Sequence, residues 1–242
     1  MVPDDFRFVA HIDILGMSSI VERDADAAWG MLSELAAVRD HAQDFELEFL
    51  DTKERLHIRE AVYAVTFSDT IVLFTKVGSD TELRCMIVLV AEILHKAMCR
   101  CVPVRAGLAF GKFYFNLDRS MYAGPALIEA YRVGESAQWI GITLADSVRE
   151  KAANLQMTSG SRDVIVDWDV PIKCGIIRRS VVNWPAVFAH DLAVAPPICI
   201  QQFYQGFENT FGAYSKLPPE AQEKYVNTVE FINAQRIRHH QA

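Results

Sequence analysis

Two aspartates stand where chain reversals could bring their carboxylates together. Asp13 lies near the end of an alternating segment, residues 7–15, and just before Gly16, while Asp69 lies at the bend between two β-rich segments. Paired carboxylates beside a glycine-containing turn can hold two divalent cations, and such a two-metal site is one solution for phosphoryl transfer. An aspartate at a strand end or hairpin bend also serves as a turn or capping residue, so spacing alone leaves both interpretations open.

Hydrophobic periodicity predicts the elements that must position these carboxylates. Residues 7–15 alternate as a strand, with Asp13 on its polar face. Further segments of regular structure follow: a helix from Asp24 or Asp26 to residue 45, a hairpin of strands 61–67 and 70–76, a helix over 80–100 and a strand over 102–115.

The order β-α-β-β-α-β predicts an α+β fold, a ferredoxin-like sandwich with both helices on one face of an antiparallel sheet. The other face is expected to be free. In such a sheet the first and third strands are neighbours, so Asp13 and Asp69 are expected to converge.

The second half of the chain predicts helical and short-strand additions to this core. We expect residues 1–155 to form the core of the domain that carries the two aspartates and residues 156–242 a C-terminal extension of the same domain. The expected elements are helices 124–139, 145–155 and 220–238 and short strands 140–144, 164–166, 170–177 and 180–184. The basic end of the last helix, Arg236, Arg238, His239 and His240, suits a helix C-terminus better than a nucleic-acid patch.

Composition and charge restrict the classes of binding partner that we expect for this protein. The 242 residues are 51% hydrophobic and carry 24 Lys+Arg against 31 Asp+Glu, a net charge of −7. This balance argues against nucleic acid polymers and anionic membranes as main partners. The longest apolar stretch, residues 85–94, is interrupted by Glu92 and is shorter than the ~20 residues of a membrane helix. With no signal-peptide pattern and an odd count of five cysteines, we expect a cytoplasmic protein with reduced thiols.

Four motifs, in order, resemble those of the class III nucleotidyl cyclases. Residues 13–20, Asp-Ile-Leu-Gly-Met-Ser-Ser-Ile, are similar to the family's signature after the first strand. Residues 67–70, Phe-Ser-Asp-Thr, resemble the hairpin that carries its second metal-binding Asp, with Ser68 in place of the usual Gly. Residues 104–111 resemble its Arg-x-Gly-Ile-x-x-Gly strand, and Gly124, Ala130 and Arg132 match its following helix. Together the motifs cover slightly over half the chain.

The resemblance implies conversion of a nucleoside triphosphate into a 3′,5′-cyclic monophosphate and pyrophosphate. Asp13, Asp69 and the backbone carbonyl of Ile14 would hold two Mg²⁺ or Mn²⁺ ions per active site, activating the ribose 3′-hydroxyl and stabilising the departing pyrophosphate. The turn that contains Gly16, Met17 and Ser18 would offer backbone N–H groups to the phosphates.

Two basic residues complete the implied site. Arg132 would stabilise the pentavalent phosphorus from the second subunit of a homodimer, because the family's sites form between subunits, and the free sheet face suits that contact. Glu129 and Glu135 lie three residues on either side of Arg132 and could simply pair with it. Lys173 follows Val-Pro-Ile much as a triphosphate-binding Lys precedes a Gly in the family's last strands.

The positions that would bind a purine depart from the family pattern. By offset, the purine-reading positions fall on Val65 and Met121, and a ribose-binding Asn falls on Ile128. Apolar side chains supply no donor or acceptor for a purine edge. The site is therefore either catalytically silent or built for another base. Retention of charged Asp13, Asp69 and Arg132 at inward positions weighs against decay.

The chain also resembles the pyrimidine cyclases of bacterial Pycsar anti-phage defence. The resemblance lies in residues 129–132, 170–175 and 183–185, and the chain shows none of the coiled-coil or membrane segments common on signalling cyclases. These form cyclic UMP or cyclic CMP to activate a separate effector, and cyclic UMP is the favoured expectation here. An adenylate or guanylate cyclase is the alternative within the enzyme class. A silent cyclase-like domain that binds nucleotide or a protein partner is the alternative outside it.

Overall fold

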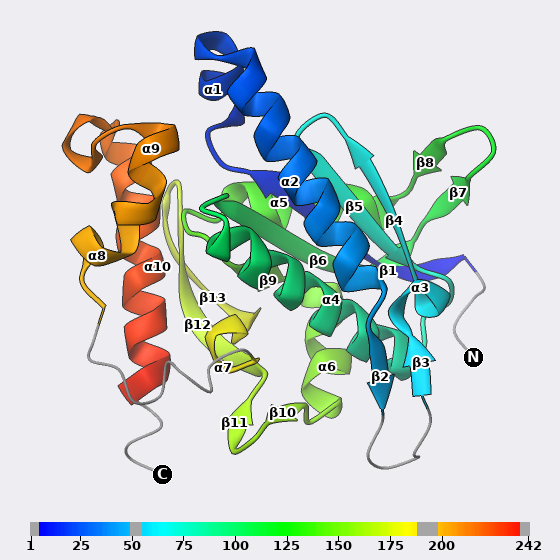
Figure 1. The fold of residues 1–242 in the computed structure, drawn as a ribbon. Coiled ribbons are helices and arrows are strands. Elements are labelled where there is room, and N and C mark those ends of the chain that lie inside the picture. The colour runs from blue at the N-terminus through cyan, green and yellow to red at the C-terminus, as the bar shows by residue number, and fades with distance from the viewer. Residues whose placement is uncertain (1–4, 49–54, 188–197, 238–242) are drawn as a thin grey trace.

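A seven-stranded sheet in the order β12-β13-β9-β6-β1-β5-β4 organises the protein (Figure 1). The computed structural model describes residues 5–48, 55–187 and 198–237. Neighbouring strands are antiparallel except β6 and β9, which are parallel. The strands are β1 (Phe6–Ile14), β4 (Val62–Phe67), β5 (Thr70–Thr75), β6 (Val104–Lys112), β9 (Ile142–Leu144), β12 (Ile165–Ile172) and β13 (Gly175–Val182).

The predicted α+β sandwich is confirmed in the four strands β6-β1-β5-β4. One face of β1 buries Phe8, Ala10 and Ile12 in the main core, which α2 (Ala25–Gln43) and α4 (Asp80–Cys99) complete. Both helices begin at side-chain caps: the Asp24 carboxylate accepts from Ala27 N–H at 3.0 Å, and the Ser79 hydroxyl accepts from Glu82 N–H at 3.3 Å. These caps anchor the layer that supports the end of β1.

The expectation that the other sheet face is free is wrong over β1 and β6. Helix α5 (Pro125–Ser136) covers these two strands on the face opposite α2 and α4 (Figure 1). The close approach depends on Gly107, because a Cβ there would lie 2.1 Å from the carbonyl oxygen of Ala130 and 2.6 Å from the amide nitrogen of Gly134. The remaining face, over β4 and β5, borders a cavity described below.

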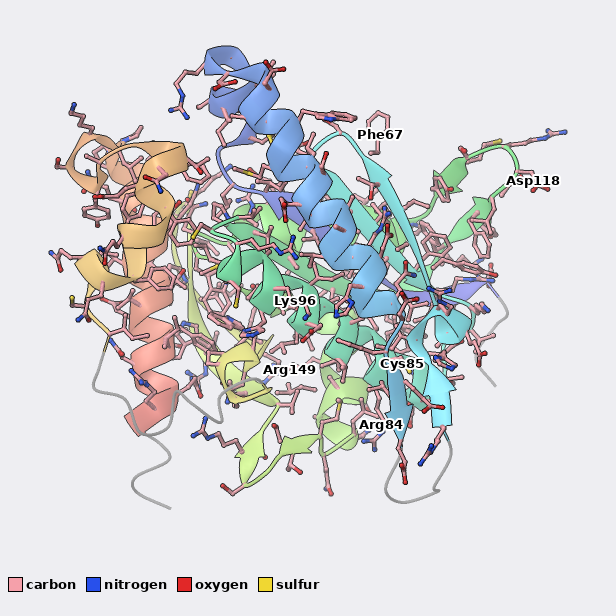
Figure 2. All side chains as sticks on the ribbon, viewed as in Figure 1. Phe67, Arg84, Cys85, Lys96, Asp118 and Arg149 are labelled. Atoms are coloured by element: carbon pink, nitrogen blue, oxygen red, sulfur yellow. The ribbon has the colours of Figure 1, made fainter. Side chains whose placement is uncertain are left out.

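The strand predicted over residues 102–115 is interrupted at Phe113. Beyond that residue the chain forms an arm, β7 (Tyr114–Asn116) and β8 (Met121–Ala123), which extends away from the body of the molecule with Asp118 at its tip (Figures 1 and 2). Phe113 is fully buried and packs on Phe74 with ring centroids 5.0 Å apart. The regular strand β6 thus ends at Lys112, directly before this buried aromatic at the base of the arm.

Three further differences from the sequence prediction are local. Short elements were not predicted: α1 (Met17–Arg23), β2 (Glu46–Glu48), β3 (Arg55–His57) and α3 (Ile58–Ala61). The short strands predicted between residues 164 and 184 are instead one hairpin, β12 and β13. Its turn interrupts the predicted strand 170–177, because Gly175 has a φ of 132°, a value that L side chains rarely adopt.

The C-terminal extension packs against the segment that follows β1. Its main helix, α10 (Pro219–Ile237), matches the predicted helix closely, although Arg238, His239 and His240 lie outside the described residues. Tyr204, Phe207 and Tyr225 form a small core with Leu15 and Ile140. The other short elements are α6 (Asp146–Asn154), β10 (Thr158–Ser159), β11 (Arg162–Asp163), α7 (Trp184–Val187), α8 (Ile200–Tyr204), η1 (Gln205–Phe207), α9 (Glu208–Phe211) and η2 (Tyr214–Lys216). Among the described helices, none is both long and apolar enough to cross a bilayer.

The contact of α5 with β6 generates a stability prediction. Gly107→Ala should lower the free energy of unfolding by about 2 kcal/mol or more, because the added methyl group would meet backbone atoms that cannot move aside. Gly30→Ala is the matched control, since an added Cβ at this exposed position of α2 meets nothing within 4 Å. It should leave stability unchanged or raise it by up to about 1 kcal/mol. Urea unfolding followed by circular dichroism measures both, and equal values would contradict the proposed close packing.

Candidate active site

The structure brings Asp13 and Asp69 together at the ends of adjacent strands. Asp13 pairs with Thr70 across β1 and β5, so Asp69 is the next residue along the neighbouring strand. The backbone N–H of Ile14 donates to the carbonyl oxygen of Asp69 at 3.3 Å, which ties the β4–β5 turn to the end of β1. Ser68, in the position of the family's usual glycine, has a φ of 53°. The topology thus explains the juxtaposition, while the role of the carboxylates stays a prediction.

Arg105 holds the Asp13 carboxylate. From the register position opposite Asp13 on β6, its Nη2 and Nε atoms both lie 3.1 Å from Asp13 Oδ2. Its Nη1 also donates to the carbonyl oxygen of Glu135 at 2.7 Å and to that of Ala137 at 3.4 Å. Arg105 is only 9% exposed, so the end of α5, β6 and β1 are joined through one buried guanidinium.

The electrostatics of this corner suit a bound cation. Burial raises the pKa of the Asp13 carboxyl; Arg105 opposes that shift, and the nearby charges of Asp69 and Glu135 add to it. A divalent cation would relieve the repulsion between the two aspartates. Carboxylate and carbonyl oxygens are the ligands that Mg²⁺ and Mn²⁺ prefer, so Asp13, Asp69 and the carbonyl of Ile14 fit these ions. Larger groups of three or more His, Cys, Asp or Glu side chains arranged for a metal are not found among the described residues.

The turn after β1 has the geometry for a close backbone approach. Gly16 has a φ of 78° and precedes α1, where Met17 is buried and Ser18 is exposed. The first N–H groups of a helix have no acceptor within it, so they can face an anion. On the opposite side, a Cβ on Gly16 would lie 3.4 Å from the ring of Phe211 in the C-terminal extension.

A cavity of about 860 Å³, here called the sheet-face cavity, lies over β4 and β5. Val65, a purine-reading position by offset, and Ile128, the ribose-binding position by offset, line it together with Tyr131. Met121 does not line it and is 58% exposed on β8, although its neighbours Ser120 and Tyr122 do. Phe67, which is 83% exposed, contributes to the lining beside the β4–β5 turn (Figure 2).

His11 lines the same cavity, and sequence reasoning did not assign it to the site. It lies two residues before Asp13 on the same face of β1, and its ring packs edge-on to Tyr131 with centroids 5.2 Å apart. Burial, with help from the positive charge of Arg105 and against the charge of Asp69, lowers its pKa to about 4. The imidazole is therefore neutral near pH 7 and can both donate and accept a hydrogen bond. The strand alternation that placed Asp13 on the polar face of β1 places His11 on that face as well, and this was the sequence signal that could have assigned His11 to the site.

Arg132 is exposed on α5, and the described residues offer it no hydrogen bond or ion pair. The two glutamates that could have paired with it have other partners. Glu129 accepts from the Ser147 hydroxyl at 2.8 Å, and Glu135 pairs with Lys173 at 2.5 Å. Arg132 is thus available to a group that the described residues do not supply.

Lys173 lies at the β12–β13 turn and lines a second cavity, also of about 860 Å³, here called the Arg105 cavity. Arg105 lines it from β6, and Lys224 and Asn227 line it from α10. Lys224 was not predicted as a site residue. The sequence identifies Lys224 only as a polar position on an amphipathic helix. Which surface that helix packs against depends on tertiary contacts, so the sequence could not place Lys224 at the cavity.

Comparison with known proteins identifies the fold. Neither family models nor curated proteins match the sequence. Among solved structures, a dimeric guanylyl cyclase domain of the RhoGC fusion protein from the aquatic fungus Blastocladiella emersonii is 18% identical, with a TM-score of 0.53 over 74% of this chain and 96% of that chain. A monomeric form of that domain is 16% identical, with a TM-score of 0.54 over 74% and 95% of the two chains.

A third structure is the catalytic core of a rhodopsin-guanylyl cyclase with converted specificity in complex with ATPαS. It is 15% identical, with a TM-score of 0.51 over 74% of this chain and 94% of that chain. Nearly the whole of each of these domains is matched, and the α+β sandwich built around Asp13 and Asp69 is therefore the class III cyclase catalytic-domain fold.

Proposed function

We propose that this protein is a metal-dependent nucleotidyl cyclase that forms a 3′,5′-cyclic nucleotide and pyrophosphate from a nucleoside triphosphate. The observation that carries the proposal is the meeting of Asp13 and Asp69 at the ends of β1 and β5 in a cyclase fold. Two Mg²⁺ or Mn²⁺ ions, when bound there, would activate the ribose 3′-hydroxyl and neutralise charge on the leaving pyrophosphate. Sequence motifs and the geometry of the strand ends support the same residues independently.

The chain's own residues have distinct tasks in this proposal. Asp13 and Asp69 hold the ions, and Arg105 orients the Asp13 carboxylate through its two contacts at 3.1 Å. The turn at Gly16 brings backbone N–H groups toward the phosphates. Arg132, exposed and without a partner among the described residues, supplies positive charge to the reacting phosphorus of a neighbouring subunit.

We propose a pyrimidine as the base, with uracil favoured over cytosine. Val65, the purine-reading position that lines the sheet-face cavity, offers no donor or acceptor to a purine's polar edge, and Ile128 offers none to the ribose. Neutral His11 and the Thr70 hydroxyl in the same lining are groups that can bind the polar edge of a smaller base. Guanylyl cyclase activity is named only for the structural neighbours, and purine turnover is the competing outcome.

A homodimer is part of the proposal. The end of β4, the β7–β8 arm and helix α5 present exposed apolar side chains, namely Phe67, Tyr114, Leu117, Met121, Ile128 and Tyr131. Apolar surface of this kind marks an interaction site. One similar domain is dimeric and another is monomeric, so assembly itself is a variable of this fold.

The motif resemblance supports a place in anti-phage defence, in which the cyclic nucleotide acts as a second messenger for a separate effector in the cytoplasm. A catalytically silent domain that binds nucleotide or a protein is the alternative from another class. Measured nucleotide turnover distinguishes the active cyclase from the silent domain.

Turnover is tested with purified protein, Mn²⁺ and each of the four common nucleoside triphosphates, with pyrophosphate release followed and the cyclic product identified by mass spectrometry. We expect cyclic UMP as the main product, with cyclic CMP next. Asp69→Ala should reduce the rate at least about a hundredfold, because one of the two carboxylate ligands is lost.

The control for Asp69→Ala is Asp26→Ala, an exposed carboxylate in the first turn of α2. It should retain full activity, and both variants should keep the circular dichroism spectrum of the unaltered protein. Full activity of Asp69→Ala would contradict the metal assignment. A purine product would contradict the assignment of the base.

Mixing two inactive variants tests whether Arg132 acts across the subunit interface. Asp69→Ala and Arg132→Ala should each be inactive, but their heterodimer contains one intact site, so an equal mixture should recover about a quarter of the original activity after subunit exchange. The measurement is pyrophosphate release against mixing time. If Arg132 served the metals of its own subunit, mixing would restore nothing.

A further inference from the structure

Lys224 is a half-buried lysine whose ammonium group has no close counterion among the described residues. It lies on α10 and lines the Arg105 cavity. The described residues give its ammonium group no hydrogen bond and no close ion pair. Burial of a charged group without a partner is unfavourable, so a position of this kind indicates a ligand of opposite charge.

The other two cations of the cavity are already engaged. Arg105 pairs with Asp13 at 3.1 Å, and Lys173 pairs with Glu135 at 2.5 Å. Among the cations that line the Arg105 cavity in the described structure, only Lys224 has no hydrogen bond or ion pair through its side chain.

Contacts between α10 and the segment after α5 fix the position of Lys224. The Asn227 side-chain amide donates to the carbonyl oxygen of Gln138 at 2.7 Å, and the backbone N–H of Ile140 donates to the Thr228 hydroxyl at 2.8 Å. Lys224 precedes Asn227 and Thr228 by one turn and therefore lies on the same side of the helix. Since Arg105 also binds the carbonyl of Ala137, the helix and the guanidinium are attached to the same stretch of backbone.

The charges around Lys224 also favour an anion. Burial lowers the pKa of Lys224, the nearby positive charges of Arg105 and Lys173 lower it further, and Glu220 and Asp13 act in the opposite direction. Five carboxylates line the cavity: Glu135, Asp169, Glu220, Glu223 and Glu230. Arg105 and Lys173 act on Lys224, so we place the attraction for an anion where these three cations lie, next to the contact of Arg105 with Asp13.

We propose that Lys224 binds the terminal phosphates of the nucleoside triphosphate, and the pyrophosphate released from it, so that α10 completes the active site. This inference rests on the proposed function. It assigns the C-terminal extension a direct part in substrate binding, with Lys224 as a charge supplied from outside the cyclase motifs.

Inorganic tripolyphosphate is the probe, because it carries the phosphate chain without base or ribose. Titration calorimetry with and without Mg²⁺ should show that Lys224→Gln binds it about tenfold more weakly than the unaltered protein does. Lys224→Arg should retain binding because it keeps the charge. Lys216→Gln, a change of an exposed lysine in the same extension, is the matched control and should bind as before.

Turnover supplies the second measurement. Lys224→Gln should raise KM for the nucleoside triphosphate about tenfold and weaken product inhibition by pyrophosphate to a similar extent, with a smaller change in kcat. Lys224→Met tests the same loss of charge with an apolar side chain of similar length, should the polar variant fold poorly. Thermal unfolding of each variant verifies that the fold is retained.

The outcomes separate this inference from the function on which it rests. Equal tripolyphosphate binding by the unaltered protein and both neutral variants overturns the role of Lys224, even if nucleotides are cyclised. Binding that depends on Lys224 in a protein that cyclises none of the four nucleotides supports the anion site and overturns the proposed function. Failure of the unaltered protein to bind tripolyphosphate in either condition also overturns the inference.

Discussion

The ion pair between Arg105 and Asp13 is the interaction on which the arrangement of the site depends. It joins two adjacent strands at the point where both reach the same edge, and the same guanidinium binds the carbonyl groups of Glu135 and Ala137 at the end of α5. A buried charge of this kind must be fully paired, since loss of one partner leaves the other in a medium of low dielectric. The strand ends, the helix that carries Arg132 and the segment bound by α10 are thereby held to one another.

Close backbone packing gives this charged corner its shape. Gly107 allows α5 to lie directly on β6, which places His11 and Tyr131 edge-on and leaves the sheet face over β4 and β5 bordered by a cavity. On the other side of Asp13, α10 and the β12–β13 turn enclose the Arg105 cavity. In the proposed reaction the base and the phosphate chain therefore have separate surroundings, one mainly apolar and one lined by charged groups, with the aspartates between them.

The positions of the positive charges explain how an acidic protein can bind an anionic nucleotide in the proposed site. An acidic protein with a charge of −7 repels a polyanion unless positive charge is concentrated where the anion binds. Arg105 and Lys173 are engaged with carboxylates, so the proposed site relies on bound divalent cations together with Lys224 and the Arg132 of a second subunit. This distribution suits a single nucleotide rather than a nucleic acid polymer.

Local sequence patterns were sufficient to predict the sandwich and the convergence of Asp13 with Asp69. These patterns are the alternation in β1, the helical periods of α2 and α4 and the hairpin at Asp69, and the topology follows from their order. Residues that recur at fixed spacing thus determined the core. The covering of β1 by α5, the partners of Arg105 and the position of Lys224 depend on how separate elements pack. Periodicity specifies which face of a helix is apolar but not which surface that face will meet, and only the tertiary structure decided that Lys224 lies beside Arg105.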